Sequence, residues 1–421
     1  MQLVAYGAQD IYLTGNPQIT FFKVVYRRHT NFSMESIECT FNGTVDFGKK
    51  TNVTISRNGD LIGAMYLEIR LPKLKQTDGG SVTEVRWSEG IGNALIKSVD
   101  VEIGGQQIDK HYGEWLDIWG ELNVDKNHRT AYDEMVGNED DPATLNASNA
   151  KRLYVPLRFW FNRNPGLALP LIALQYHEVK INLEIEKVLN LVRGTGATVT
   201  NVLDDSGSAA SITSCQLYVD YIYLDTDERR RFAQVSHEYL IEQVQHTGVE
   251  SLEGGSTNEK VTLNFNHPVK SLHWVIQNDD YLNSSDNLIN PTSRNVKGGQ
   301  KLRYYVKSQT DGKDDTFLTG KLMLNGHDRA PERHSDYFRL VQNVQHMDAS
   351  PTKTIYTYSF ALKASEHQPS GTCNFSRIDN ATLNLTFNSN QAADSRSLKL
   401  YAVNYNVLRI MSGMGGLAYS N

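Results

Sequence analysis

The chain contains the same pattern twice, about half its length apart. Residues 154–186 hold an apolar run, an Asn-Pro-Gly break and then a strand pattern in which apolar and polar residues alternate. Residues 355–388 follow the same plan around a Pro-Ser-Gly break. Asn182 aligns with Asn384, an offset of 202 in a chain of 421 residues. A repeat of this length predicts two similar structural units in tandem.

Other segments recur in the same order around this pair. Each pair shares its plan: strand, tight turn and strand; a hairpin followed by an apolar segment; or a single long alternating strand. The pairs are 51–69 with 260–276, 98–122 with 320–338, and 216–225 with 398–410. Four elements repeated in one order are hard to attribute to chance.

The local pattern favours short strands over long helices. Asn42-Gly43 and Asn58-Gly59 lie between alternating apolar runs, which is the strongest short-range signal for a hairpin. Turn signals recur about every eight to twelve residues, as in sandwiches and barrels. Only residues 115–122 show a clear helical spacing, that of a short amphipathic helix. We therefore predict an all-β chain of two tandem eight-stranded jelly rolls, with short helices in the loops.

The predicted organisation has four parts. They are an N-terminal arm at 1–25, a first jelly roll at 26–226, a linker at 227–236 and a second jelly roll at 237–421. The three arginines at 229–231 could suggest a phosphate site, but acidic neighbours favour a solvated connector. Polar stretches at 123–150, 193–214 and 277–316 are predicted as loops, the first with a further helical turn.

Composition excludes several classes of function. A net charge of −6 argues against direct binding of nucleic acid, which needs a basic footprint. The longest apolar stretch, 166–174, is about half of what a bilayer requires, and no signal peptide is evident. Cys39, Cys215 and Cys373 are few and far apart, which fits buried thiols in a reducing compartment.

No motif for catalysis, a cofactor or a metal is found. Nucleophile elbows, phosphate loops, dinucleotide fingerprints and zinc helices are all missing from the sequence. His177-Glu178 lacks a second histidine at zinc spacing, and the histidines at 327, 334 and 346 have no ligand-like spacing. The Gly-rich tail at 412–420 is interpreted as a flexible terminal segment. Glycans are possible at sequons on Asn31, Asn42, Asn52, Asn146, Asn283, Asn374, Asn380 and Asn384.

Four long stretches carry a family resemblance. They are LTGNPQITFFKVVYRRHTNF, RNPGLALPLIALQYHEVKI, QPSGTCNFSRIDNATL and NYNVLRIMSGMGGLAY. Together they resemble the major capsid proteins of large icosahedral double-stranded DNA viruses, most closely those that infect algae. The resemblance implies a double jelly roll, a homotrimeric pseudo-hexagonal capsomer, and a shell that lies over an internal membrane. It also implies minor capsid partners, synthesis in the host cytoplasm and residence in the virion.

We expect the N-terminal arm to make contacts between molecules. The candidate residues are Pro17, Phe21, Phe22, Tyr26 and Arg27, packed at the capsomer base against a neighbouring subunit or the membrane-side layer. The alternative is that the arm merely completes the first roll. For the whole chain, a carbohydrate- or receptor-binding jelly roll is the second hypothesis, and a cupin-type enzyme is the third.

Overall fold

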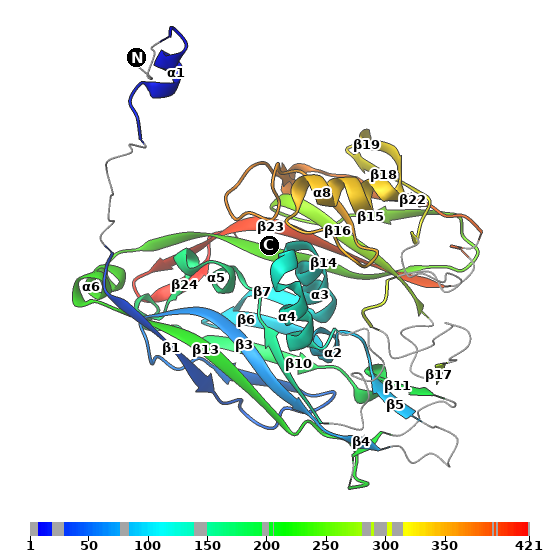
Figure 1. The fold of residues 1–421 in the computed structure, drawn as a ribbon, viewed down its shortest axis with the longest axis horizontal. Coiled ribbons are helices and arrows are strands. Elements are labelled where there is room, and N and C mark those ends of the chain that lie inside the picture. Colours follow the sequence, from blue (N-terminus) through cyan, green and yellow to red (C-terminus); the bar gives the residue numbers. More distant parts are fainter. Residues whose placement is uncertain are drawn as a thin grey trace, which may run out of the picture.

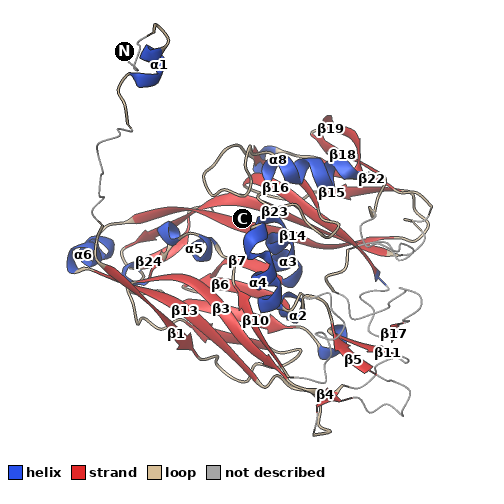
Figure 2. Ribbon diagram, viewed as in Figure 1, coloured by secondary structure: helices blue, strands red, loops and turns tan. Residues whose placement is uncertain are grey.

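Strands from distant parts of the chain lie side by side in two sandwiches, one built from each half of the sequence (Figures 1 and 2). The computed structural model describes residues 7–18, 29–75, 84–138, 150–195, 202–204, 206–279, 288–289, 301–304, 315–389, 391–392 and 395–419. The strand pairs of both sandwiches are antiparallel, and most neighbouring strands come from distant parts of the chain.

The first sandwich consists of two sheets. One has the order β1 (Phe32–Cys39), β13 (Ser214–Leu224), β3 (Leu61–Leu71), β8 (Lys151–Pro156), with β9 (Leu169–Pro170) also paired to β3. The other has the order β2 (Lys50–Thr54), β10 (Val179–Ile185), β6 (Ile96–Ile103), β7 (Gln106–Tyr112).

The second sandwich repeats the main strand order of both sheets and adds one strand, β24. Its larger sheet runs β14 (His237–Leu252), β23 (Arg396–Met411), β16 (Pro268–Asn278), β20 (Tyr356–Ser359), with β21 (Cys373–Asn374) paired to β16 and β24 (Met414–Leu417) to β23. Its smaller sheet runs β15 (Asn258–Thr262), β22 (Ala381–Thr386), β18 (Thr319–Leu324), β19 (His327–His334). The predicted double jelly roll is confirmed.

The aligned asparagines occupy the same place in the two rolls. Asn182 lies in β10 opposite Asn52 of β2, and Asn384 lies in β22 opposite Lys260 of β15. Their neighbours alternate between interior and exterior, so that every second residue of β10 and of β22 is buried. The alternation seen in the sequence therefore corresponds to the inner and outer faces of each roll.

Short helices and small strand pairs fill the connections. The helices are α1 (Asp10–Thr14), α2 (Ile91–Leu95), α3 (Gly113–Asn123), α4 (Lys126–Val136), α5 (Trp160–Arg163), α6 (Thr226–Gln234) and α8 (Gln342–His346). Shorter turns are η1 (Pro165–Leu167), η2 (Leu171–Ala173), η3 (Val188–Asn190), the π-helical η5 (Tyr337–Val341) and η6 (Phe375–Arg377). Small sheets join β5 (Glu84–Trp87), β11 (Val192–Thr195) and β17 (Leu288–Ile289), and β4 (Leu74–Lys75) with β12 (Leu203–Asp204).

Some predicted loops are wrong, while the helix predicted at 115–122 is confirmed as α3. The stretch 123–150 contains an 11-residue helix, α4, whose signal was weak because only Tyr132 and Val136 are buried. Helix α6 occupies most of the expected linker. None of its residues is buried, so the sequence there lacks the apolar periodicity that predicts a helix. The tail forms strand β24 instead of a free terminal segment. Most of 277–316 lies outside the described residues.

Two large hydrophobic cores stabilise the chain. The second fills the second roll, where Trp274 stacks on Tyr356 and meets Phe338 edge-on. The first core fills the first roll and extends to Val275 and Tyr401 of the second roll. These two residues lie on the face of the β14-β23-β16 sheet that points away from the second core. The two rolls are therefore joined by a buried apolar junction.

Candidate assembly surfaces

The arm is described only in part. Helix α1 lies apart from both rolls (Figure 1), and its Tyr12 side chain is 90% exposed. Pro17 follows it and is exposed, whereas Phe21, Phe22, Tyr26 and Arg27 lie outside the described residues. The first described strand begins at Phe32, so the predicted contacts of Phe21, Phe22, Tyr26 and Arg27 stay a prediction.

The two rolls meet where the edge strand β7 of the first lies against the edge strand β14 of the second. The Gln243 side-chain amide donates to the carbonyl of Ile108, and the Val244 N–H donates to Asp109 Oδ1 over 3.0 Å. These bonds satisfy edge groups that would otherwise be left open to other chains.

Helix α3 adds a row of carboxylates to this junction. Glu114 accepts from Lys399 Nζ at 2.7 Å, and Asp117 accepts from Lys353 Nζ at 2.8 Å. Glu121 accepts from the Thr352 N–H at 2.8 Å. All three acids are buried, and all three partners belong to the second roll. The sequence carries a signal for this row, because acids spaced three and four residues apart lie on one face of a helix.

A second ionic cluster surrounds Glu242 of β14. Its carboxylate accepts from Lys270 Nζ at 2.6 Å within the second roll and from Arg163 at 2.7 Å in helix α5 of the first. His367 Nδ1 lies 3.3 Å away. The side chains of Glu242 and Lys270 are both only 3% exposed, so each depends on the other for its charge.

The pKa values of these acids follow from their partners. Burial alone would raise the pKa of Glu114, but Lys301 and Lys399 outweigh it and lower the pKa to about 2. Burial is likewise the largest influence on Glu242, and His367, Lys270 and Arg163 together lower its pKa to about 2. Both acids are therefore charged at neutral pH and act as ionic ties.

A cavity of about 460 Å³ opens at the same junction. Much of its charged lining is paired: Lys97 meets Glu184 at 2.6 Å, and Lys301 meets Glu186 at 3.3 Å. His246 Nδ1 lies 2.9 Å from the Leu400 carbonyl, so this histidine contacts backbone rather than a side-chain nucleophile. The lining also includes Ser98, whose hydroxyl donates to Glu184 Oε2 over 3.5 Å, so that these side chains form a structural network of ion pairs and hydrogen bonds.

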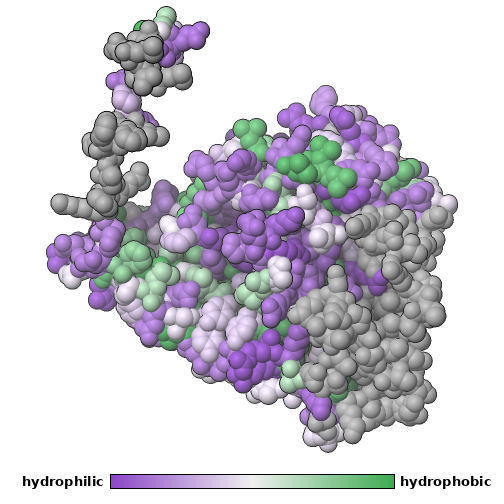
Figure 3. Space-filling model, in the orientation of Figure 1, coloured by the Kyte–Doolittle hydropathy of each residue, from purple (hydrophilic) through white to green (hydrophobic). Residues whose placement is uncertain are grey.

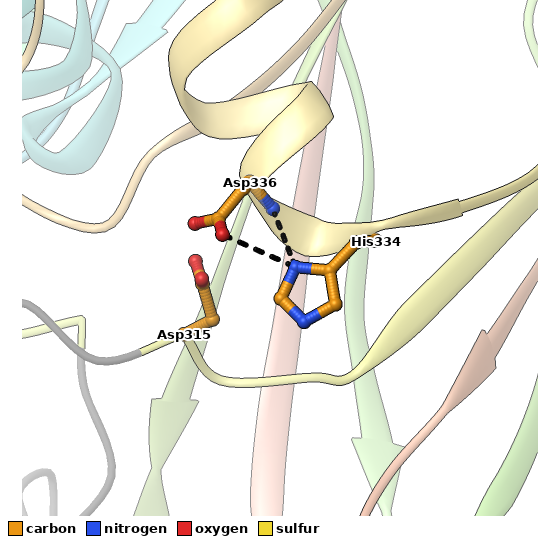
Figure 4. A group of neighbouring side chains, drawn as sticks. All are labelled: Asp315, His334 and Asp336. Carbon is orange, nitrogen blue, oxygen red and sulfur yellow. Dashed lines mark hydrogen bonds and ion pairs between the residues drawn. The ribbon is translucent and has the colours of Figure 1, made fainter.

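Three potential metal ligands meet on the second roll, although the sequence spacing did not suggest it. Asp315, His334 and Asp336 place ligand atoms within 4.8 Å of one another (Figure 4). Arg339 already donates to Asp315 and to Asp336, each over 2.8 Å. The Asp336 N–H also donates to His334 Nδ1 over 3.3 Å. The guanidinium supplies the positive charge that a cation would bring, so the arrangement is that of a surface ion-pair network.

The other sequence candidates have structural roles. His177 Nδ1 lies 3.0 Å from the Gly415 carbonyl and so ties the tail to the first roll. Arg229 pairs with Asp60 at 3.0 Å, which anchors α6 to the first roll. The three cysteines are free; Cys39 is buried, and burial raises the pKa of the Cys215 thiol to about 12. Among the described residues, no helix is long and apolar enough to cross a membrane.

Comparison with solved structures defines the class of protein. The chain matches the PBCV-1 virus capsid with a TM-score of 0.78 and 40% identity, covering 96% of this chain and 100% of that one. The Faustovirus major capsid protein matches in fold with a TM-score of 0.74 at 14% identity, covering 96% of this chain and 94% of that one. The fold is thus that of viral double jelly-roll capsid proteins.

Sequence comparison then gives the family. The profile described as "Major capsid protein N-terminus" matches residues 20–225, and "Large eukaryotic DNA virus major capsid protein" matches 228–416. The major capsid proteins of Pyramimonas orientalis virus and Paramecium bursaria Chlorella virus 1 are 52% and 44% identical, each covering 100% of this chain and 99% of its own length. The chain belongs to the major capsid proteins of large eukaryotic DNA viruses.

Membership of this family decides between the three hypotheses. The relatives are structural proteins of the virion, so the prediction that the chain is a capsid protein and not an enzyme is confirmed. No comparison supports the carbohydrate-binding alternative.

Proposed function

We propose that three copies of this chain form a pseudo-hexagonal capsomer, and that such capsomers tile an icosahedral shell. One observation carries the proposal: the strand order β1-β13-β3-β8 of the first roll recurs as β14-β23-β16-β20 in the second. Three copies supply six similar rolls, which makes a nearly six-fold block from a single chain. Closed symmetry limits assembly of each block to a fixed size.

The mass of the purified protein in solution tests the trimer. We expect a stable particle of three times 47.4 kDa, seen as a pseudo-hexagonal outline by electron microscopy. A monomer at every concentration, with no hexagonal particles, would overturn the proposal.

The N-terminal arm is proposed to link capsomers at their base. Pro17, Phe21, Phe22, Tyr26 and Arg27 would contact a neighbouring subunit or the layer beside the internal membrane. The exposed position of Pro17 and the separation of α1 from both rolls support a role outside the roll (Figure 1).

Deletion of residues 1–25 tests the arm. Trimers should remain soluble while capsid assembly fails. Phe21→Ser with Phe22→Ser isolates the aromatic contribution, and Ile11→Ser with Tyr12→Ser in the exposed helix α1 serves as its control. Normal capsids from the truncated chain would exclude this role, and a truncated chain that no longer folds would favour the arm as part of the first roll.

The wider setting follows from the same proposal. Minor capsid proteins and the internal membrane would lie against the capsomer base, and synthesis would take place in the host cytoplasm. A net charge of −6 supports a shell without direct contact to nucleic acid. Glycans would attach at exposed sequon asparagines such as Asn374 and Asn380, which mass spectrometry of peptides tests. We also propose 26–226 and 237–421 as folding units, joined by the segment at 227–236.

A further inference from the structure

The internal repeat places a helix at the same position in each roll, but the helix of the first roll is covered and the helix of the second roll is exposed. Helix α3 follows strand β7, and the helix formed by η5 and α8 follows β19, the corresponding strand of the second roll. Both helices therefore leave their roll at the same point of the fold. Within one chain, however, only α3 has another roll beside it.

Helix α3 is covered by the second roll. The Trp115 ring lies 5.6 Å from the rings of His273 and Tyr401, which form a cross-strand pair between β16 and β23. Beside this contact, Asp117 pairs with Lys353. Among the described residues, α3 has no exposed large hydrophobic side chain. The contact of α3 with the outer face of this sheet is thus a complete interface between two rolls.

The corresponding helix of the second roll is uncovered and apolar. Leu340, Val341 and Val344 are 45%, 41% and 69% exposed, and Leu362 in the adjacent loop is 74% exposed. The Leu362 carbonyl lies 2.9 Å from His346 Nδ1, which holds the loop against α8. We call these four side chains the helix patch, and Figure 3 shows hydrophobic surface gathered over α8. A cluster of exposed apolar side chains of this kind is typical of an interaction site.

The matching acceptor lies on the first roll. Tyr66 and Tyr218 form a cross-strand pair between β3 and β13, the strands that correspond to β16 and β23. The two strands can be aligned by the short strand that pairs with each. Strand β9 pairs with β3 from Leu61, and Tyr66 lies five residues after Leu61. Strand β21 pairs with β16 from Pro268, and His273 lies five residues after Pro268. The tyrosine pair therefore takes the place of His273 and Tyr401.

The tyrosines form one aromatic surface. The Tyr66 ring stacks on Tyr218 at 5.2 Å and meets Tyr154 of β8 edge-on at 6.2 Å, and all three rings are partly exposed. We call them the tyrosine patch. In Figure 1 the strands β1, β13 and β3 lie on the side of the first roll remote from the second, and α8 lies on the side of the second roll remote from the first.

We propose that the helix patch of one copy packs on the tyrosine patch of the next copy, repeating between chains the contact that α3 makes within the chain. This inference rests on the proposed trimer and names its contact surfaces. Because the two patches differ and lie at opposite sides of the molecule, the contact is head-to-tail. In a ring of three copies, each chain makes one α3 contact between its own two rolls and one helix-patch contact with the next chain. The six rolls then form a closed ring.

Two charged variants test the two patches separately. Leu340→Asp with Val344→Asp changes the helix patch. Tyr66→Lys with Tyr218→Glu changes the tyrosine patch while keeping an attractive pair across β3 and β13. We expect each variant to remain folded by circular dichroism and to raise the dissociation constant of the trimer by about a hundredfold or more. Val344→Ile and Tyr218→Phe are the matched controls and should leave native trimers.

Mixing the two charged variants tests the direction of the contact. One variant keeps an intact tyrosine patch and the other keeps an intact helix patch, so the two variants can still form one contact with each other. Native mass spectrometry of a 1:1 mixture should therefore show heterodimers, whereas neither variant alone should form a dimer through this contact. Trimers of undiminished stability in either variant, or no heterodimer in the mixture, would refute the inference while leaving the trimer itself in place. A native chain that is monomeric would instead refute the proposed function.

Discussion

Replacement of Glu242 by glutamine should weaken the junction between the rolls by a measurable amount. The substitution keeps the size of the side chain and removes its charge. Lys270, only 3% exposed, then loses its nearest anion, and Arg163 of the first roll loses its partner in β14. A buried cation left without its partner is strongly destabilising.

The magnitude can be taken from the pKa of the acid. A folded-state pKa of about 2 against the ordinary 4.5 corresponds to about 3 kcal/mol at neutral pH. This lies at the lower end of the roughly 3 to 5 kcal/mol lost when one partner of a buried pair is removed. With an unfolding entropy of about 2.1 cal/mol/K per residue, the melting temperature should fall by roughly 3 to 4 °C if the chain unfolds as one unit.

Scanning calorimetry at neutral pH measures this shift. Glu238→Gln is the matched control, because Glu238 lies on the same strand and pairs with Arg409 at 2.8 Å, but both side chains are more than half exposed. An exposed pair of this kind contributes about 0 to 1 kcal/mol. Equal shifts for the two variants, or a shift below about 1 °C for Glu242→Gln, would refute the view that this ion cluster holds the rolls together.

Two further predictions concern acid and packing. The pKa values of Glu114 and Glu242 are lowered from 4.5 to about 2 in the folded chain. Their contribution to stability is therefore complete above pH 4.5 and is lost as the pH falls from 4.5 to 2. The melting temperature should drop steeply in that pH range, and a melting temperature that does not change there would contradict the assignment. Gly113→Ala would place a Cβ 2.3 Å from two backbone carbonyl oxygens and should cost about 3 kcal/mol in urea unfolding. Gly63→Ala is the control, because its Cβ would lie 3.7 Å from the Ile222 side chain, and it should be nearly neutral. Equal urea midpoints for the two variants would contradict the prediction and show that the backbone moves to accept the Cβ at residue 113.

Periodicity was a reliable guide wherever a side chain alternates between one core and solvent. The residues of β10 and β22 were recognised on this basis, and so was the amphipathic helix α3. Helix α6 was missed because none of its residues is buried, and α4 because only two are. The tail was interpreted as free because pairing of β24 with β23 leaves no pattern within MSGMGGLAY itself.

The junction could not be predicted in the same way. Glu114 meets a lysine 285 residues later and Asp117 meets one 236 residues later, and no local spacing encodes such a pair. The approach of Asp315 to His334 likewise depends on how the second roll closes. Burial then sets the chemistry, because the same acids would be ordinary solvated carboxylates on a free helix.

The sequence by itself determined the strands, their turns and the duplication of one roll, because these depend on residues close together in the chain. Only the tertiary structure decided which surfaces the duplication covers and which it leaves open. The two rolls share one strand order, yet α3 is buried against β16 and β23 while the helix at 337–346 exposes Leu340 and Val344. That asymmetry arises because a chain with two rolls can make only one such junction internally.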